Sequence, residues 1–389
     1  MTGPHSSSLC LCCGTAALRE IAGFTELPRV TSDSKPFGAG GRLFVCSACG
    51  LTQKLPDPAW LAEIAGIYDA YNMHHQAGGT PDQVIFDPQT GAPTPRCELL
   101  ARRLSEAGLP DAGAMLDVGV GGGAMVSAFS RAFPRWRLFG LDLDERKLDV
   151  LRRIPRFERL FTCPADQLDL SVDLMTLVHS LEHLLEPRVM LRTLRDRLGQ
   201  GGRLFIQVSN TAQNPFDLVI ADHLCHFSQA TLESMVSRAG FVVEHSRTDW
   251  VPKELSFVAQ RGADREPAPC DGAAAVAAVS ADVDGLHRLL AGARRLGASA
   301  PFGILGTSVA ATWLAGALGD RVAFFVDEDP ARVGREHLGR PVFRPSDAPA
   351  GAVIYLAFPA AIAQSIARRL APLGLRLELP EFQSPSTAP

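Results

Sequence analysis

A glycine-rich turn after an apolar segment constrains the fold of this 389-residue chain more than any other feature. The segment Met115-Leu-Asp-Val-Gly-Val-Gly-Gly-Gly123 predicts a strand that runs into a turn, and residues 124–133 follow with helical spacing. The glycines of the turn let the backbone pass close to a ligand. Apolar runs and helical periodicity alternate from residue 111 to about residue 260. This alternation predicts an α/β fold with a parallel sheet.

A second predicted strand ends in an acidic residue. The segment Arg137-Leu-Phe-Gly-Leu-Asp142-Leu-Asp144 places Asp142 about 20 residues beyond the glycine turn, where a carboxylate accepts hydrogen bonds from both hydroxyls of a ribose. Asp144 is the alternative residue for this role. Capping of the following helix is the alternative function for both acids. A glycine turn alone does not separate this site from dinucleotide-binding folds.

The cysteines are unevenly placed, and five of the nine precede residue 50. Cys10 and Cys13 form one C-x2-C pair, and Cys46 and Cys49 form a second. A two-residue spacer lets two thiolates face one tetrahedral ion, so we expect one structural Zn²⁺ bound through these four residues. A closed four-sulfur site supplies stability and leaves no position for substrate. The alternatives are buried or redox-active thiols, or replacement of one ligand by Cys12.

Charge and hydropathy exclude several classes of partner. The chain has 38 Lys and Arg against 42 Asp and Glu, a net charge of −4, so no basic excess is present to hold a nucleic acid backbone. No run of about 18 apolar residues predicts a membrane span. Residues 1–8 lack the basic and apolar parts of a signal peptide, so we expect a cytoplasmic protein with reduced thiols.

Five motifs in order over about 150 residues resemble those of class I S-adenosylmethionine-dependent methyltransferases. They are Asp117-Val-Gly119-Val-Gly121-Gly-Gly, Gly140-Leu-Asp142, Ala165-Asp166, Asp173-Leu-Met-Thr-Leu-Val-His179-Ser-Leu-Glu182-His183 and Gly201-Gly-Arg-Leu-Phe-Ile-Gln-Val. This resemblance implies a Rossmann-like domain with S-adenosylmethionine as cofactor. Val120 departs from the small residue or cysteine that is frequent in the family, which the site tolerates because the backbone makes the contact.

The resemblance also implies a role for each matching residue. Gly119 and Gly121 approach the methionine part of the cofactor, and Asp117 orients the glycine turn or the cofactor's amino group. Asp142 holds the ribose. The remaining expected contacts are Leu143 over the adenine, Asp166 at the adenine amino group, and His179 at the pocket wall, where a hydrogen bond within the core is the alternative.

The whole chain resembles the zinc-containing sugar C-methyltransferases of deoxysugar pathways. Beyond the cysteine pairs and the central motifs, the similar segments are Phe302-Gly-Ile-Leu-Gly306-Thr-Ser, Phe325-Val-Asp327-Glu-Asp-Pro-Ala-Arg-Val-Gly334 and Gly339-Arg-Pro-Val. The resemblance implies methylation of the carbon beside a keto group on a nucleotide-linked sugar. The expected regions are a zinc-binding module (1–60), a helical connector over the active site (61–110), the methyltransferase domain (111–262), a linker and helix (263–300) and a smaller C-terminal α/β domain (301–389).

Carbon methylation requires a general base, because the carbon must first lose a proton beside the carbonyl. The segment Asp222-His223-Leu-Cys-His226-Phe-Ser follows the fifth predicted strand, and His183 follows the fourth. We predict His223 as the leading base, His183 as a second base or a substrate-orienting group, and Asp222 as a residue that orients a neighbour or binds substrate. Capping or packing is the alternative for each. His74 or His75 stands near the tyrosine expected from the family, and Ile220 replaces another tyrosine.

Three other functions are weighed against this one. An O-methyltransferase would use His223 to deprotonate a hydroxyl group of another small molecule. A zinc-containing nucleic-acid-binding module is disfavoured by the net charge, and a cofactor-binding protein without turnover stays open. A nicotinamide site at Gly303-Ile-Leu-Gly306 is disfavoured because Val309 stands where a third glycine is needed. We expect the C-terminal domain to close over the nucleotide or sugar of the substrate, and a purely structural or pairing role is the alternative.

Overall fold

The structure, a computed structural model, describes residues 8–70, 82–87, 89–263, 267 and 270–380. Its largest sheet has seven strands in the order β10-β9-β8-β11-β12-β15-β14. The first five run parallel, β15 runs antiparallel to β12, and β14 runs antiparallel to β15. The strands are β8 (Ala112–Val118), β9 (Arg135–Leu141), β10 (Phe157–Phe161), β11 (Val172–Val178), β12 (Leu198–Ser209), β14 (Phe241–Arg247) and β15 (Glu254–Arg261).

Helices cover both faces of this sheet because its strands are apolar on both sides. Met115 packs with the buried faces of α2 and α3, whereas the next residue, Leu116, packs with those of α1, α5 and α6. A strand alternates its side chains between two faces, so neighbouring residues enter different cores. The helices are α1 (Pro58–Asp69), α2 (Arg96–Glu106), α3 (Ala124–Ala132), α4 (Leu148–Leu151), α5 (Pro187–Arg195) and α6 (Gln229–Arg238).

The N-terminal residues form a small antiparallel sheet that includes a strand from the large domain. Its order is β1-β4-β5-β13, with β1 (Leu18–Glu20), β4 (Phe44–Cys46), β5 (Thr52–Gln53) and β13 (Cys225–His226). Cys225 pairs with Gln53 and His226 with Thr52. Two segments about 170 residues apart are therefore joined by backbone hydrogen bonds. A two-stranded ribbon, β2 (Arg29–Val30) and β3 (Pro36–Phe37), completes this region.

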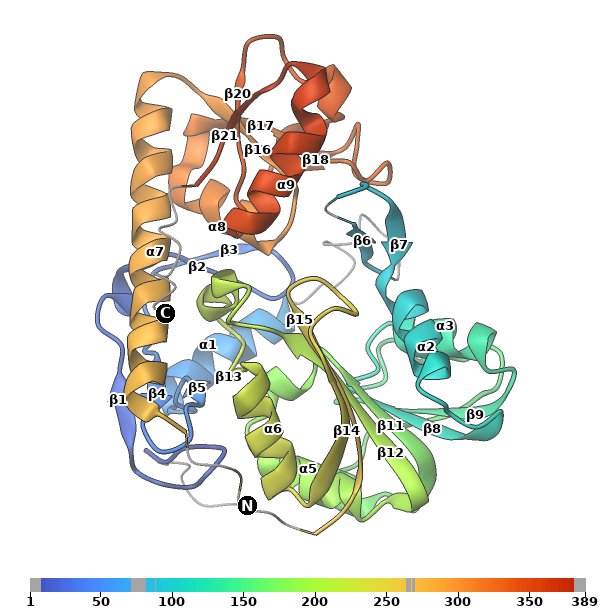
Figure 1. Ribbon diagram of the computed structural model, residues 1–389. Coiled ribbons are helices and arrows are strands. Elements are labelled where there is room, and N and C mark those ends of the chain that lie inside the picture. The colour runs from blue at the N-terminus through green and yellow to red at the C-terminus, as the bar shows by residue number, and fades with distance from the viewer. Residues whose placement is uncertain (1–7, 71–81, 88, 264–266, 268–269, 381–389) are drawn as a thin grey trace.

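A second α/β unit follows the long helix α7 (Gly272–Ser299). Its sheet has the order β18-β19-β17-β16-β20-β21. These strands are β16 (Phe302–Leu305), β17 (Val322–Val326), β18 (Glu336–His337), β19 (Arg340–Phe343), β20 (Val353–Tyr355) and β21 (Arg376–Glu378), with helices α8 (Val309–Leu318) and α9 (Ala360–Leu370). α7 spans about 42 Å and runs from the cysteine module to this sheet (Figure 1).

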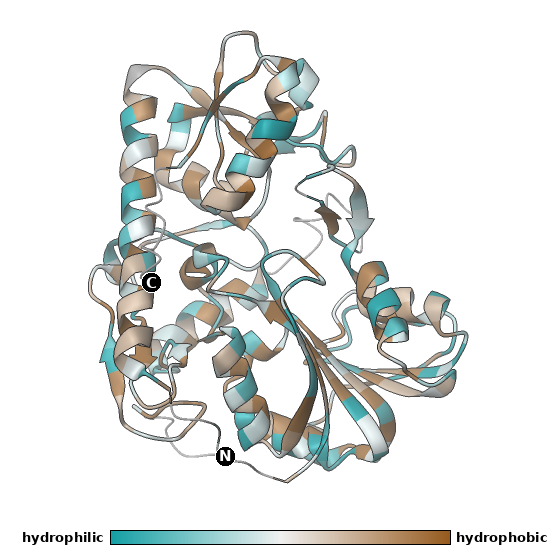
Figure 2. Ribbon diagram, viewed as in Figure 1, coloured by the Kyte–Doolittle hydropathy of each residue, from teal (hydrophilic) through white to brown (hydrophobic). Residues whose placement is uncertain are grey.

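Hydrophobic and hydrophilic residues are interleaved along α7 (Figure 2). Its buried residues are Val283, Leu286, Leu289, Leu290 and Ala293, whose spacing places them on one face. They share one core with Phe24 of the N-terminal region and Trp313 of α8. The helix therefore ties the first and last parts of the chain together. None of the helices in the described residues is both long enough and apolar enough to cross a membrane.

The predicted fold class, α/β with a Rossmann-like sheet, is confirmed. One local expectation needs correction, because residues 61–110, expected to be a helical connector, also contain two strands. A hairpin of β6 (Val84–Phe86) and β7 (Pro93–Pro95) lies between α1 and α2. The two prolines of β7 occupy a short edge strand, where a missing N–H donor is tolerated. The five domain boundaries stay a prediction.

Candidate active site

The glycine turn joins β8 to α3 at the edge of the sheet where the parallel strands end. Gly119 has φ +77°, and its N–H donates to Leu141 O at 2.8 Å, which holds the turn against β9. A side chain at Gly140 would meet Val120 Cγ1 at 2.8 Å, and one at Gly119 would meet Ser180 Cβ at 2.7 Å. The turn therefore lies close to both β9 and the loop that follows β11.

Asp142 follows β9 and organises this turn. Its Oδ2 accepts the Gly121 N–H at 2.7 Å, and its Oδ1 accepts the Leu143 N–H at 2.7 Å. A carboxylate has about four acceptor positions, so capacity remains for the two hydroxyls of a ribose. Leu143 is 86 % exposed, more than any other large hydrophobic side chain among the described residues. An exposed apolar side chain beside such an acceptor fits an adenosine group bound at this turn.

Asp142→Ala is expected to weaken S-adenosylmethionine binding at least tenfold while the protein still folds, because charge-assisted hydrogen bonds are lost. Asp144→Ala is the matched control. Asp144 instead accepts the Arg146 N–H at 2.8 Å and pairs with the Arg146 guanidinium. Calorimetric titration of the three proteins measures the difference. An unchanged affinity in Asp142→Ala removes this residue from the site.

Asp117 is buried at the end of β8. Its Oδ1 accepts the Thr176 hydroxyl at 2.6 Å. Burial raises the pKa of Asp117 to about 7, the bond from Thr176 opposes this rise, and the neighbouring Asp142 adds to it. The folded protein therefore holds a proton on Asp117 across a pH range in which the unfolded chain has released it.

Asp117→Asn is expected to stabilise the unliganded protein at neutral pH, by on the order of a few kcal/mol. The pKa of Asp117 is higher in the folded than in the unfolded protein. The free energy of unfolding that wild type loses by ionising Asp117 therefore grows from about pH 4 to pH 7 and is constant above that. Urea unfolding at pH 5 and pH 8 measures the gain. The exposed Asp111, substituted Asp111→Asn, is the control. A gain that is the same at both pH values contradicts the expectation.

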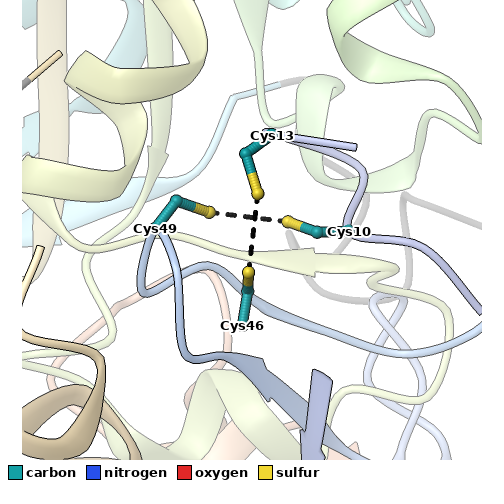
Figure 3. Close-up of side chains that lie close together, drawn as sticks. All are labelled: Cys10, Cys13, Cys46 and Cys49. Carbon is teal, nitrogen blue, oxygen red and sulfur yellow. Dashed lines mark hydrogen bonds between the residues drawn. The ribbon is translucent and has the colours of Figure 1, made fainter. Parts of the chain in front are cut away.

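Four thiols converge at the start of the chain. The sulfur atoms of Cys10, Cys13, Cys46 and Cys49 all lie within 4.8 Å of one another. Cys10 Sγ is 3.5 Å from Cys49 Sγ, and Cys13 Sγ is 3.5 Å from Cys46 Sγ (Figure 3). Tetrahedral zinc with Zn–S bonds near 2.3 Å places its sulfur atoms about 3.8 Å apart. The donor set therefore fits Zn²⁺.

Both cysteine pairs lie on tight turns that end in a glycine. Gly14 has φ +75° and Gly50 has φ +78°, and each donates its N–H to the carbonyl of the first cysteine of its pair. This conformation favours glycine, so the local sequence explains the turn. Cys12 is buried outside the four-sulfur group, with its Sγ 3.6 Å from Ser234 Oγ of α6.

A buried charged cluster follows β12. Asp217 lies in the short turn Pro215–Val219 and contacts two imidazoles through different oxygens. His223 Nδ1 is 2.9 Å from Asp217 Oδ1, and His226 Nδ1 is 2.7 Å from Asp217 Oδ2. These residue types also suit a metal ion, but each imidazole already uses the carboxylate as its partner. Lys54 adds a basic group to this cluster, and its Nζ is 3.1 Å from His226 Nε2.

The two histidines that share Asp217 have pKa values shifted in opposite directions. Burial disfavours the charged form of both. For His223 the carboxylates of Asp217, Glu182 and Asp222 together outweigh burial, so the pKa of His223 is raised. For His226 the ammonium of Lys54 adds to burial, and the pKa of His226 falls to about 4. His226 is therefore neutral at pH 7, and Asp217 stabilises the imidazolium that forms when His223 takes a proton.

His183 lies beside His223 at the edge of the sheet. Their rings are perpendicular, with centroids 4.7 Å apart. His183 Nδ1 is 3.1 Å from Asp222 O and 3.2 Å from Tyr68 Oη. Burial and the charge of His223 lower the pKa of His183. The Asp222 carboxylate accepts from Ser32 N at 2.8 Å and from its hydroxyl at 2.5 Å, so it anchors the loop.

His179 lies between two carboxylates. Its Nδ1 is 3.0 Å from Glu182 Oε1, and its Nε2 is 3.1 Å from Glu254 Oε2. Burial opposes protonation, but Glu254 and Glu182 together outweigh it and raise the pKa of His179 to about 9. Arg96 also pairs with Glu254 at 3.2 Å. The ring nitrogens of His179 thus face protein carboxylates, and its contact with the cofactor stays a prediction.

Glu254 also lines a cavity of about 190 Å³. This cavity is lined by strand β6 of the hairpin, by the segment Val251–Glu254 and by the second α/β unit. Lys253 has φ +67°, and its Nζ lies 5.7 Å from the centre of the Phe358 ring. Gly306, Asp327 and Arg332 come from the turns that follow β16 and β17. Glu254 thus lines this cavity and also contacts His179.

The structure brings most of the predicted site residues together. Asp117, Gly119, Gly121, Asp142 and Leu143 surround one turn, while Asp166 lies exposed after β10. His183, Asp222 and His223 lie together. His74 and His75 lie outside the described residues.

Sequence reasoning missed Lys54, Asp217 and Glu254. An acid inside the apolar segment 215–221 was an available signal for Asp217. Nothing in the local sequence marked Lys54, because its partners lie more than 160 residues away.

Comparisons with known proteins identify the domain around the glycine turn. Residues 94–246 match the profile of a family described as a methyltransferase domain, which is less than half of the chain. A search of curated proteins found no match. Similar solved structures include a Burkholderia thailandensis 1,6-didemethyltoxoflavin-N1-methyltransferase with bound S-adenosylhomocysteine. It is 17% identical, with a TM-score of 0.40, over 55% of this chain and 96% of that chain.

Two further solved structures cover a smaller part of the chain. The mitomycin 7-O-methyltransferase MmcR is 17% identical with a TM-score of 0.38, over 43% of this chain and 53% of that one. Human N-acetylserotonin methyltransferase in complex with SAM is 17% identical with a TM-score of 0.36, over 43% and 51%. The chain thus spans about half the length of these two proteins. The profile match shows a methyltransferase domain over residues 94–246.

Proposed function

We propose that the protein transfers a methyl group to the carbon beside a keto group of a nucleotide-linked sugar, with His223 as the general base. One observation carries the proposal. His223 Nδ1 is bonded to the buried Asp217, so Nε2 is the nitrogen available to take a proton. The imidazole follows β12 at the sheet edge where the glycine turn follows β8. Ligands of open α/β sheets bind at this edge.

The residues divide the chemistry between them. Bound S-adenosylmethionine supplies an activated methyl group at the turn held by Asp142. His223 Nε2 accepts the proton from the substrate carbon, and the carboxylate of Asp217 stabilises the resulting imidazolium. His183, with its lowered pKa, stays neutral and orients the keto group or acts as the second base. Positioning of carbon, base and methyl group accounts for much of the rate.

The cavity beside Glu254 is the proposed site for the rest of the substrate. Phe86, Val326 and Phe358 give it apolar surface for a base or sugar ring, and Lys253 gives it a cation for a phosphate. Glu254, which lines the cavity, also contacts His179. Zn²⁺ at the four cysteines is proposed as structural, because the four sulfur atoms complete its coordination.

Incubation with ¹³C-methyl S-adenosylmethionine and a panel of keto sugar nucleotides tests the proposal. We expect a product whose methyl carbon has the NMR shift of a C–CH₃ group. An O–CH₃ shift would assign the alternative, in which His223 deprotonates a hydroxyl. Cofactor binding without any labelled product from the keto sugars or from hydroxylated metabolites would overturn both.

A further inference from the structure

The cysteine module holds the loop that carries the proposed base. Ser32 donates to the carboxylate of Asp222, and the Trp60 indole N–H donates to Ala221 O at 3.1 Å. Lys54 Nζ donates to Ile220 O at 2.6 Å and to His223 O at 2.7 Å. These contacts reach four consecutive residues of the loop. The loop geometry therefore depends on residues of the N-terminal region.

Lys54 is an unusual residue for this position because it is 1 % exposed. Burial lowers the pKa of Lys54 to about 7, and the nearby Asp217 and Asp222 oppose this. A buried ammonium costs several kcal/mol unless it is paired and hydrogen-bonded. Two carbonyls and one imidazole face it here and provide a partner for each of its three N–H donors.

We propose that Lys54, His226 and Asp217 form a buried chain of positioning residues that holds His223 with Nδ1 protonated and Nε2 free. The proposal rests on the proposed role of His223 as the base. Lys54 donates to His226 Nε2, which leaves the proton of His226 on Nδ1. That proton is donated to Asp217 Oδ2. The second oxygen, Oδ1, is then fixed in place to accept from His223 Nδ1.

The chain works in the same sense as a carboxylate that orients an imidazole in a hydrolase. His226 stays neutral, so the negative charge of Asp217 stabilises His223 when His223 takes a proton. The charged and titratable groups that face His223 are Asp217, His226, His183, Glu182 and Asp222, together with Lys54. Glu182 and Asp222 also favour the charged imidazole, so Asp217 must be tested separately.

NMR of the full-length protein labelled with ¹⁵N-histidine tests the chain without any substrate. In wild type we expect His223 and His226 as Nδ1–H tautomers with hydrogen-bonded protons far downfield. Asp217→Asn is expected to lower the pKa of His223 and to remove its downfield proton. The control is Asp282→Asn on α7, because the raised pKa of Asp282 has burial as its cause. An unchanged pKa and tautomer of His223 in Asp217→Asn overturns the proposal.

Lys54→Met provides a second, independent variant in case Asp217→Asn does not fold. Removal of the ammonium is expected to raise the pKa of His226, which then competes with His223 for Asp217. A His226 that titrates as in wild type overturns the role of Lys54. Both variants should bind S-adenosylmethionine with wild-type affinity, because neither residue contacts the glycine turn.

The kinetic readout separates positioning from a purely structural role. With an accepted substrate, Asp217→Asn is expected to lower kcat roughly 10²–10⁴-fold with little change in KM. The acid limb of its pH profile should move to lower pH, and Asp217→Glu should restore part of the rate. If wild type methylates no keto sugar nucleotide, the proposed function fails while the NMR result still decides this proposal.

Discussion

His223→Gln is expected to lower methyl transfer by roughly 10²–10⁴-fold, the usual contribution of a general base, while S-adenosylmethionine binding is retained. Glutamine keeps a polar group near Asp217 but accepts no proton from carbon. Initial rates with the accepted keto substrate and calorimetric titration of the cofactor measure the two effects. His245→Gln, on an exposed position of β14, is the matched control.

The pattern of loss identifies the role of His223. A general base affects turnover and leaves cofactor affinity near its wild-type value, because the cofactor residues lie on other loops. Equal losses in turnover and in cofactor affinity would show a structural residue. If His183 orients the keto group, His183→Gln should lower turnover less than His223→Gln does. A larger loss of turnover in His183→Gln would instead make His183 the general base and His223 the orienting group.

Cys46→Ser is expected to release the metal and to unfold the N-terminal module. Structural zinc supplies about 10–16 kcal/mol of apparent free energy to small zinc-binding peptides. Because Lys54, Ser32 and Trp60 of this region hold the loop Ile220–His223, methyl transfer should be lost together with the metal. Elemental analysis, thermal unfolding and activity measure the three consequences.

Cys12→Ser is the control for this experiment, because Cys12 is buried nearby but lies outside the four-sulfur group. It should retain about one Zn²⁺ per chain and wild-type activity. Freshly purified wild-type protein without zinc would contradict the metal assignment. Retention of activity in a metal-free, folded Cys46→Ser protein would show that the loop does not depend on the metal.

Features that depend on a short stretch of sequence could be predicted from the sequence. The Cys-x2-Cys spacing and the glycine after each pair dictate the two turns, and the segment from Met115 to Gly123 dictates a strand and a ligand-facing turn. Asp142 was recognisable because its distance along the chain from that turn follows from the β-α-β geometry. The confirmed α/β fold class rests on the same local periodicity.

The sequence by itself thus determined the fold class, the cysteine pairs and the candidate cofactor residues, because spacing within one element or one β-α-β unit controls each of them. Only the tertiary structure decided that Lys54 meets His226, that Asp217 serves two histidines, and that Glu254 connects a cavity to His179. These contacts join segments that are distant in the chain. Packing of the whole chain, and the requirement to pair buried charges, brings them together.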